Sequence, residues 1–197
     1  MAAGAKASPR SRRASPEEQR KNVSTALYMI DEHGVNTLGV KLVAGRNFTA
    51  DDVTYRTKDD KGSPHSLIIT QALADALYPE GHAVGKVIYT GIGGKNAPLT
   101  IVGIVERLQA PWVGWEKVEH SMLVPQYQDG EFDSGSSRYL VRTEPGRRDE
   151  VMKEAERKLG AINTGRIVRG LRSVEEVRGD SYRQDRAMTI VLATVIL

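Results

Sequence analysis

The stretch that most constrains the fold is the seven-residue run LTIVGIV at positions 99–105. Five of its residues are β-branched and none is charged. Such side chains are stiff at χ1 and pack well on a pleated sheet. A β-branched run also occurs in buried helices, but Gly103 and the short span favour a strand. Because both faces of the run are apolar, we predict a central strand that is covered on both sides.

Several shorter elements are predicted around this strand. Residues 26–30 read as a strand or a short helical turn, and residues 66–69 read as a strand. Thr70 then caps a helix that Pro79 ends. Residues 86–89 form the next strand, and the glycine-rich turn after them predicts an antiparallel pair with the 99–105 strand.

The remaining segments of the first 137 residues read as loops and one further strand. Thr49 caps a turn through its hydroxyl. Residues 51–64 are charged and without pattern, which indicates a surface loop. Residues 107–120 form a long excursion that carries Trp112 and Trp115. Residues 122–124 are a short strand closed by Pro125.

A second unit follows, with a strand–helix–strand pattern. Residues 138–143 and 166–169 are the two predicted strands, and they are expected to run parallel. The helix between them spans residues 147–159, has Val151, Ala155 and Leu159 on one face, and is closed by Gly160. The sequence Ser-Val-Glu-Glu at 173–176 has the spacing of a capping box for a final helix.

The two ends of the chain differ in character. The N-terminal residues, rich in Ala, Ser, Arg and Lys, are predicted to be a disordered basic tail without the apolar core of a signal peptide. The last eleven residues carry no charge. A helix of that length spans about 16 Å, half of what a membrane requires. We predict a truncated membrane helix; the alternative is a C-terminal helix buried against the protein's own core.

Charge and composition exclude several functions. Residues 1–21 hold six basic and two acidic residues, a net +4, so the other 176 residues sum to −1 within the total of +3. The basicity therefore belongs to the tail, and nucleic-acid binding is not expected. The absence of cysteine excludes thiolate catalysis, disulfides and cysteine-based zinc sites.

No catalytic constellation is present. His33, His65, His82 and His120 lie in predicted loops without metal-ligand spacing. The glycine-rich stretches fit no phosphate-binding frame, and no serine sits in a nucleophile elbow. The adjacent acids Asp51-Asp52 are expected to point apart. We therefore predict no catalytic, metal-binding or cofactor-binding residue; Trp112 and Trp115 are the best candidates for exposed contact residues.

The order of these segments resembles a known family. The series comprises residues 38–48 (LGVKLVAGRNF), Asp51-Asp52, residues 67–74 (LIITQALA), residues 77–79 (LYP), residues 83–88 (AVGKVI) and the 99–105 strand. It is similar to the periplasmic core domain of MacB/FtsX-type ABC transporter permeases. The YLVRT sequence at 139–143, the amphipathic helix, SVEEV at 173–177 and YRQDR at 182–186 continue the pattern.

The resemblance implies an α/β fold with mixed sheets, arranged as a two-lobed periplasmic core domain. Residues 1–25 would be the basic tail, 26–137 the inserted α/β lobe, 138–180 the membrane-proximal βαβ lobe and 181–197 the start of a transmembrane helix. It further implies a non-enzymatic, membrane-associated domain that faces the periplasm from the bacterial inner membrane and serves export or the transmission of force to the cell envelope.

Transport by such a protein depends on other parts. The resemblance implies an ABC ATPase subunit or domain, the remaining permease helices and a periplasmic adaptor as partners, with no cofactor and no nucleic acid. The chain would be a fragment of a permease that lacks most membrane helices. The alternative is a soluble α/β binding or interaction module whose hydrophobic C-terminus docks on the protein itself.

Overall fold

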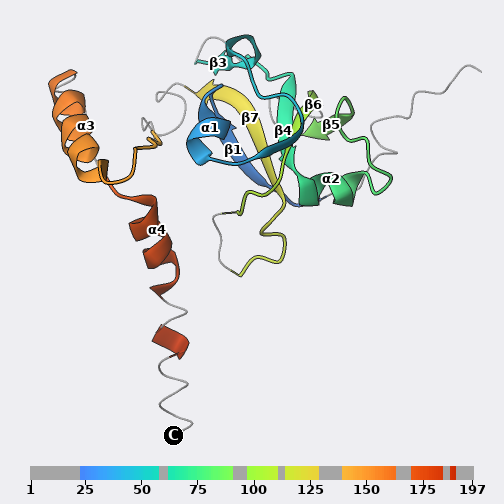
Figure 1. Ribbon diagram of the computed structural model, residues 1–197. Helices are drawn as coiled ribbons and strands as arrows, with labels where there is room; N and C mark the ends of the chain where they lie inside the picture. Colours follow the sequence, from blue (N-terminus) through green and yellow to red (C-terminus); the bar gives the residue numbers. More distant parts are fainter. Residues whose placement is uncertain are drawn as a thin grey trace, which may run out of the picture.

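The computed structural model describes residues 23–57, 62–90, 97–110, 114–128, 139–162, 170–183 and 187–189. Within these ranges the chain is an α/β protein built on a seven-stranded mixed sheet (Figure 1). The strand order is β1-β7-β4-β6-β2, with β3 paired to β7 and β5 paired to β6. The predicted fold class of mixed α/β structure is confirmed.

The central strand is β6, Ala97–Val105. On one edge it pairs parallel with β4, Ser66–Thr70. It also pairs antiparallel with β5, Val87–Thr90, along its first half and with β2, Leu42–Gly45, along its second half. The predicted central strand and its antiparallel partner are therefore confirmed.

A bulge near Gly103 separates the β5-paired half of β6 from the β2-paired half. The register with β4 skips a residue between Ile101 and Gly103, and Val102 O accepts a hydrogen bond from Arg46 N at 2.9 Å. Gly45, at the end of β2, has φ +73°, and a Cβ there would lie 2.9 Å from Gly103 Cα. The two backbones approach this closely because both positions are glycine.

Strand β7, Ser121–Gln128, is longer than predicted, because Pro125 lies inside it and does not close it. It pairs parallel with β1, Ala26–Ile30, up to Pro125 and parallel with β3, Thr54–Arg56, after it. Proline has no N–H to donate, so it fits at the position where β7 changes partners. The prediction of a loop throughout residues 51–64 is wrong at β3.

Helices cover both faces of the sheet. Helix α2, Gln71–Leu77, packs Leu73 and Ala74 against a buried cluster on one face. Helix α1, Gly34–Leu38, packs Val35 against a second cluster on the other face. The first cluster also contains Leu67, Ile69, Ala83, Leu99, Ile101, Ile104 and Val124, and the second contains Phe48, Ile68, Val105 and Leu123.

The caps of the short helices agree only partly with the sequence. Thr49 forms a capping box with Asp52 at the 3-10 turn η1, Ala50–Asp52, as predicted. Thr70 is the residue before α2, but its side chain does not cap that helix. Its hydroxyl instead donates to Glu119 O at 2.7 Å and accepts from Ser121 N at 3.1 Å. Thr70 therefore ties β4 to the start of β7.

Helices α3 and α4 stand clear of the sheet (Figure 1). Helix α3, Arg148–Ile162, continues through Gly160, which does not close it as predicted. Helix α4, Val174–Ser181, begins at the predicted capping box, in which Ser173 Oγ accepts from Glu176 N at 3.1 Å. No helix in the described ranges is long and apolar enough to cross a membrane.

The predicted strand at 138–143 is wrong, since residues 139–143 form no strand. Tyr139, Leu140 and Val141 are 68%, 49% and 61% exposed. A strand needs a neighbour for its backbone groups, and none of the described segments pairs with this one. The predicted strand at 166–169, most of the tail at 1–25 and residues 190–197 of the predicted membrane helix lie outside the described residues.

The close approach of β2 and β6 gives a prediction for stability. Gly45→Ala adds a Cβ against Val102 O and Gly103 Cα in a left-handed backbone conformation. We expect a loss of about 2–3 kcal/mol in the free energy of unfolding, measured by urea denaturation.

Gly85→Ala is the matched control, because Gly85 has φ +83° with open space around a Cβ. The free energy of unfolding of this variant should fall by only about 1 kcal/mol. Equal losses in the two variants would contradict a role for the close approach.

Candidate functional site

The four histidines are spread over the domain, and the structure brings no two of them together as a site. His33 precedes α1, and its Nε2 lies 3.6 Å from Glu32 Oε1. His65 and His82 are exposed. His120 is partly buried just before β7. Burial lowers the pKa of His120, and the positive charge of Lys117 lowers it further. The negative charge of Glu119 opposes this shift. Among the described residues no three His, Cys, Asp or Glu side chains gather where a metal ion could be held.

The predicted contact residues Trp112 and Trp115 are placed differently. Trp112 lies outside the described residues, whereas Trp115 is half-buried in the turns between β6 and β7. Two backbone hydrogen bonds help to close this loop: Ala110 N donates to Val118 O and Val118 N donates to Trp115 O. The role of Trp115 in binding a partner stays a prediction.

The densest polar cluster joins Arg46, at the end of β2, to Asp52 in η1. Two guanidinium nitrogens of Arg46 donate to the two carboxylate oxygens of Asp52 at 2.6 and 2.9 Å. Thr49 adds hydrogen bonds from its N–H and its hydroxyl, each at 2.9 Å, and Ser66 Oγ lies 3.2 Å away. This bidentate geometry is the strong form of an arginine–carboxylate pair.

The electrostatics of this cluster fit a structural role. The Asp52 side chain is only 12% exposed, and the hydrogen bonds from Arg46, with those of Thr49, hold the pKa of Asp52 well below its ordinary value of 3.8. The adjacent Asp51 is exposed, as expected for acids that point apart. Burial opposes the charged form of Asp52, but the hydrogen bonds from Arg46 and Thr49 outweigh it, so Asp52 acts as a charged hydrogen-bond acceptor.

Helices α3 and α4 present a different kind of surface. Val151, Met152, Ala155 and Leu159 recur on one face of α3, yet no residue of this helix is buried, and Ile162 at its end is 79% exposed. Arg148 Nη1 lies 3.4 Å from Glu175 Oε2 and links α3 to α4. The predicted amphipathic helix is confirmed, and its apolar face has no covering partner among the described residues.

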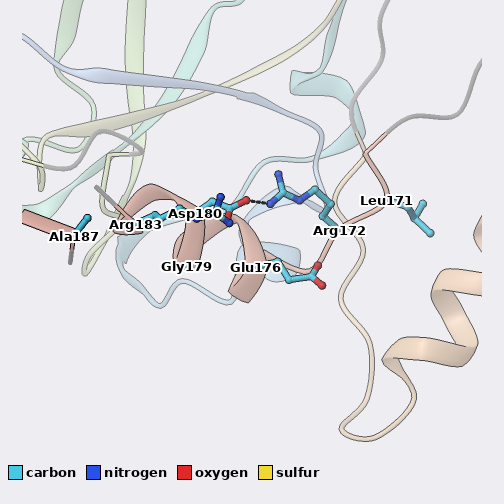
Figure 2. Close-up of a pocket in the computed structure, with 7 residues that line it drawn as sticks. All are labelled: Leu171, Arg172, Glu176, Gly179, Asp180, Arg183 and Ala187. Atoms are coloured by element: carbon cyan, nitrogen blue, oxygen red, sulfur yellow. Dashed lines mark hydrogen bonds and ion pairs between the residues drawn. The ribbon is translucent and has the colours of Figure 1, made fainter. Parts of the chain in front are cut away.

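A hollow of about 770 Å³ lies along α4 (Figure 2). Its centre is Asp180, which pairs with Arg172 and, at 2.6 Å, with Arg183. Arg172 and then Arg183 lower the pKa of Asp180. Among the described lining residues, the carboxylate of Asp180 is thus paired with two arginines, and Glu176 Oε2 accepts from Ser173 N at 2.7 Å. The lining residues are Leu171, Arg172, Glu176, Gly179, Asp180, Arg183 and Ala187.

Comparison with known proteins identifies the family. A family model described as "MacB-like periplasmic core domain" matches residues 2–158, most of the chain. The chain belongs to this family. The match starts nearer the N-terminus than residue 26, where the predicted inserted lobe begins, and it stops within α3. The α4 segment, which continues the family pattern in the sequence, lies beyond the matched range.

Individual relatives agree with this assignment. The macrolide export ATP-binding/permease protein MacB of Campylobacter fetus subsp. fetus (strain 82-40) is 31% identical over 94 residues, which are 48% of this chain and 13% of that protein. This member of the MacB-like family therefore spans a small part of its curated relative's length.

Two solved structures are also similar to the chain. The periplasmic region of MacB from Actinobacillus actinomycetemcomitans has a TM-score of 0.46 and 19% identity, covering 69% of this chain and 56% of that one. The extracellular domain of the noncanonic ABC-type transporter YknZ from Gram-positive bacteria has a TM-score of 0.44 and 21% identity, covering 69% and 63%.

The sequence predicted the turn at Thr49 that holds Asp52, but not the pairing of Asp52 with Arg46. Both residues belong to the stretch that carries the family resemblance, but spacing alone does not pair an arginine with a carboxylate six residues later. The signal was the Thr49 cap, because a turn that brings Asp52 back to Thr49 also brings it to Arg46.

The depressed pKa of Asp52 gives a prediction with a defined sign. A carboxyl whose pKa is lowered by folding stabilises the protein above its unfolded pKa, near 4, and this stabilisation disappears as the pH falls toward the folded pKa. Asp52→Asn should cost about 1–3 kcal/mol in unfolding free energy at pH 7 and flatten the decline of stability below pH 4, measured by urea denaturation across pH.

Asp51→Asn is the control, since Asp51 is the exposed neighbour in the same turn. It should change stability by less than about 0.5 kcal/mol and keep the acid-dependent slope. A variant Asp52→Asn with the wild-type slope below pH 4 would contradict the assigned role of the pair.

Proposed function

We propose that this chain is the non-enzymatic extracytoplasmic domain of an ABC transporter permease, and that it passes conformational change between the membrane and the cell envelope. The observation that carries the proposal is the family match over residues 2–158. The domain is located on the periplasmic side of the bacterial inner membrane. Residues 26–137 form the inserted lobe, which is the distal lobe relative to the membrane, 138–180 form the membrane-proximal lobe, and 181–197 begin a transmembrane helix.

The architecture supports a mechanical role. The sheet is packed on both faces by two apolar clusters, so it moves as a stiff body. The described segments after residue 138 instead bury few apolar side chains, and the contacts of Arg142 and Arg148 are polar. A stiff body attached through a softly held segment transmits displacement without chemistry. The charged groups of the described clusters are paired internally, which leaves them as structural elements.

The partners follow from the relatives. The name of the Campylobacter protein describes an export protein with ATP-binding and permease parts. We infer that an ATP-hydrolysing subunit or domain and the remaining permease helices act with this chain, and that a periplasmic adaptor protein contacts its distal lobe. Neither a cofactor nor a nucleic acid has a part in this function.

The location can be tested by cysteine labelling, because the chain has no native cysteine. Glu80→Cys places a thiol in the exposed turn after α2. In cells expressing the gene in its natural arrangement, a maleimide that crosses the outer but not the inner membrane should label this thiol.

Leu73→Cys is the control for a folded domain, since Leu73 is fully buried and should stay unlabelled until denaturant is added. Labelling of Glu80→Cys only by a membrane-permeant maleimide would place the domain in the cytoplasm and overturn the proposal.

The alternative of a soluble binding module makes the opposite prediction for the C-terminus. Removal of residues 187–197 should leave the unfolding free energy of the sheet domain unchanged and raise solubility if this segment is a membrane helix. If the segment docks on the protein's own core, each buried apolar side chain removed should cost about 1.5–3 kcal/mol. Urea denaturation of both forms in the same detergent separates the two readings.

A further inference from the structure

Arg142 lies in the segment between the sheet and α3, and it reaches back to the end of α1. Its Nε donates a hydrogen bond to Thr37 O at 2.9 Å, between residues 105 positions apart in the chain. The last carbonyls of a helix have no partner within the helix. The guanidinium supplies one, and its positive charge suits the C-terminal end of a helix.

Gly39 leaves the space that this guanidinium occupies. Gly39 ends α1 with φ +68°, and its N–H donates to Val35 O and Asn36 O. A Cβ on Gly39 would collide with the Arg142 side chain, with Cζ only 2.7 Å away. Glycine therefore serves two needs at this position: the left-handed cap and the room for the guanidinium.

The two ends of this contact belong to different parts of the molecule. Val35 of α1 is buried in the cluster that also holds Ile68 and Val105 of the central strands, so α1 moves with the sheet. Arg142 precedes α3 by a short turn in which Arg147 N donates to Glu144 O at 3.2 Å. Tyr139, Leu140 and Val141 beside it are largely exposed, so apolar packing does little to hold this segment.

We propose that Arg142 is a positioning residue that fixes α3 relative to the sheet by clamping the C-terminal end of α1. The inference rests on the proposed function, because it names the contact through which the sheet and the membrane-proximal segment move together. When the Arg142–Thr37 contact is formed, α3 has one orientation relative to the sheet. When this contact is broken, α3 adopts many orientations.

The experiment measures distances between two spin labels on the full chain. Asp75→Cys on α2 and Glu156→Cys on α3 provide exposed attachment sites in a chain without native cysteine. Pulsed electron spin resonance should give a distance distribution whose width at least doubles in Arg142→Ala. Gly39→Ala should broaden the distance distribution similarly, because the added Cβ fills the space of the guanidinium while Arg142 itself is unchanged.

Tyr139→Ala is the matched control, since it removes a large side chain from the same exposed segment without touching the clamp. It should leave the width unchanged. A wild-type width in Arg142→Ala, or equal broadening in Tyr139→Ala, would overturn the proposal. Maleimide labelling of Glu80→Cys in cells does not depend on Arg142, so a failure of the clamp and a failure of the proposed location give different results.

Discussion

The architecture depends on the contact between the backbones of β2 and β6. Strand β6 has β4 along one edge, while two short antiparallel strands, β5 and β2, share the other. Between these two strands, the bulge near Gly103 turns Val102 O toward Arg46 N. The glycines at 45 and 103 make room for it.

The Arg46–Asp52 pair extends this constraint into the next part of the chain. Arg46 uses its backbone N–H to complete the β2–β6 contact and its side chain to hold Asp52 in η1. Asp52 in turn receives hydrogen bonds from Thr49 and Ser66, the second of which begins β4. Arg46 thus connects the edge of the sheet to η1, and Asp52 connects η1 to the start of β4. Together these contacts fix the turn that leads into β3.

Local patterns in the sequence predicted the elements whose signal lies within a few residues. The β-branched run became β6, the Ser-Val-Glu-Glu sequence became the cap of α4, and the spacing of Val151, Ala155 and Leu159 became α3. Strand β3 was missed because Thr54–Arg56 has little apolar character of its own. It is a strand because β7 continues past Pro125 and offers an edge to pair with.

The residues that make the long-range polar contacts were harder to predict for the same reason. Asp52 is recognisable as half of a capping box, but its pairing with Arg46 depends on the fold of the turn. Arg142 bonds to a backbone carbonyl 105 positions away, and a carbonyl acceptor leaves no mark on residue type. The error at 138–143 is related, because a β-rich composition forms a strand only where a second strand is available.

The different ways in which the two parts are held together determine how they respond to force. Burial of apolar side chains is lost only when many contacts separate at once, so the sheet with its two clusters yields cooperatively. Arg142 instead holds its segment to α1 through a single hydrogen bond to Thr37 O, which can break without the loss of the other contacts. In the relay that we propose, displacement arriving through α3 would reorient the helix about this contact before it deforms the sheet.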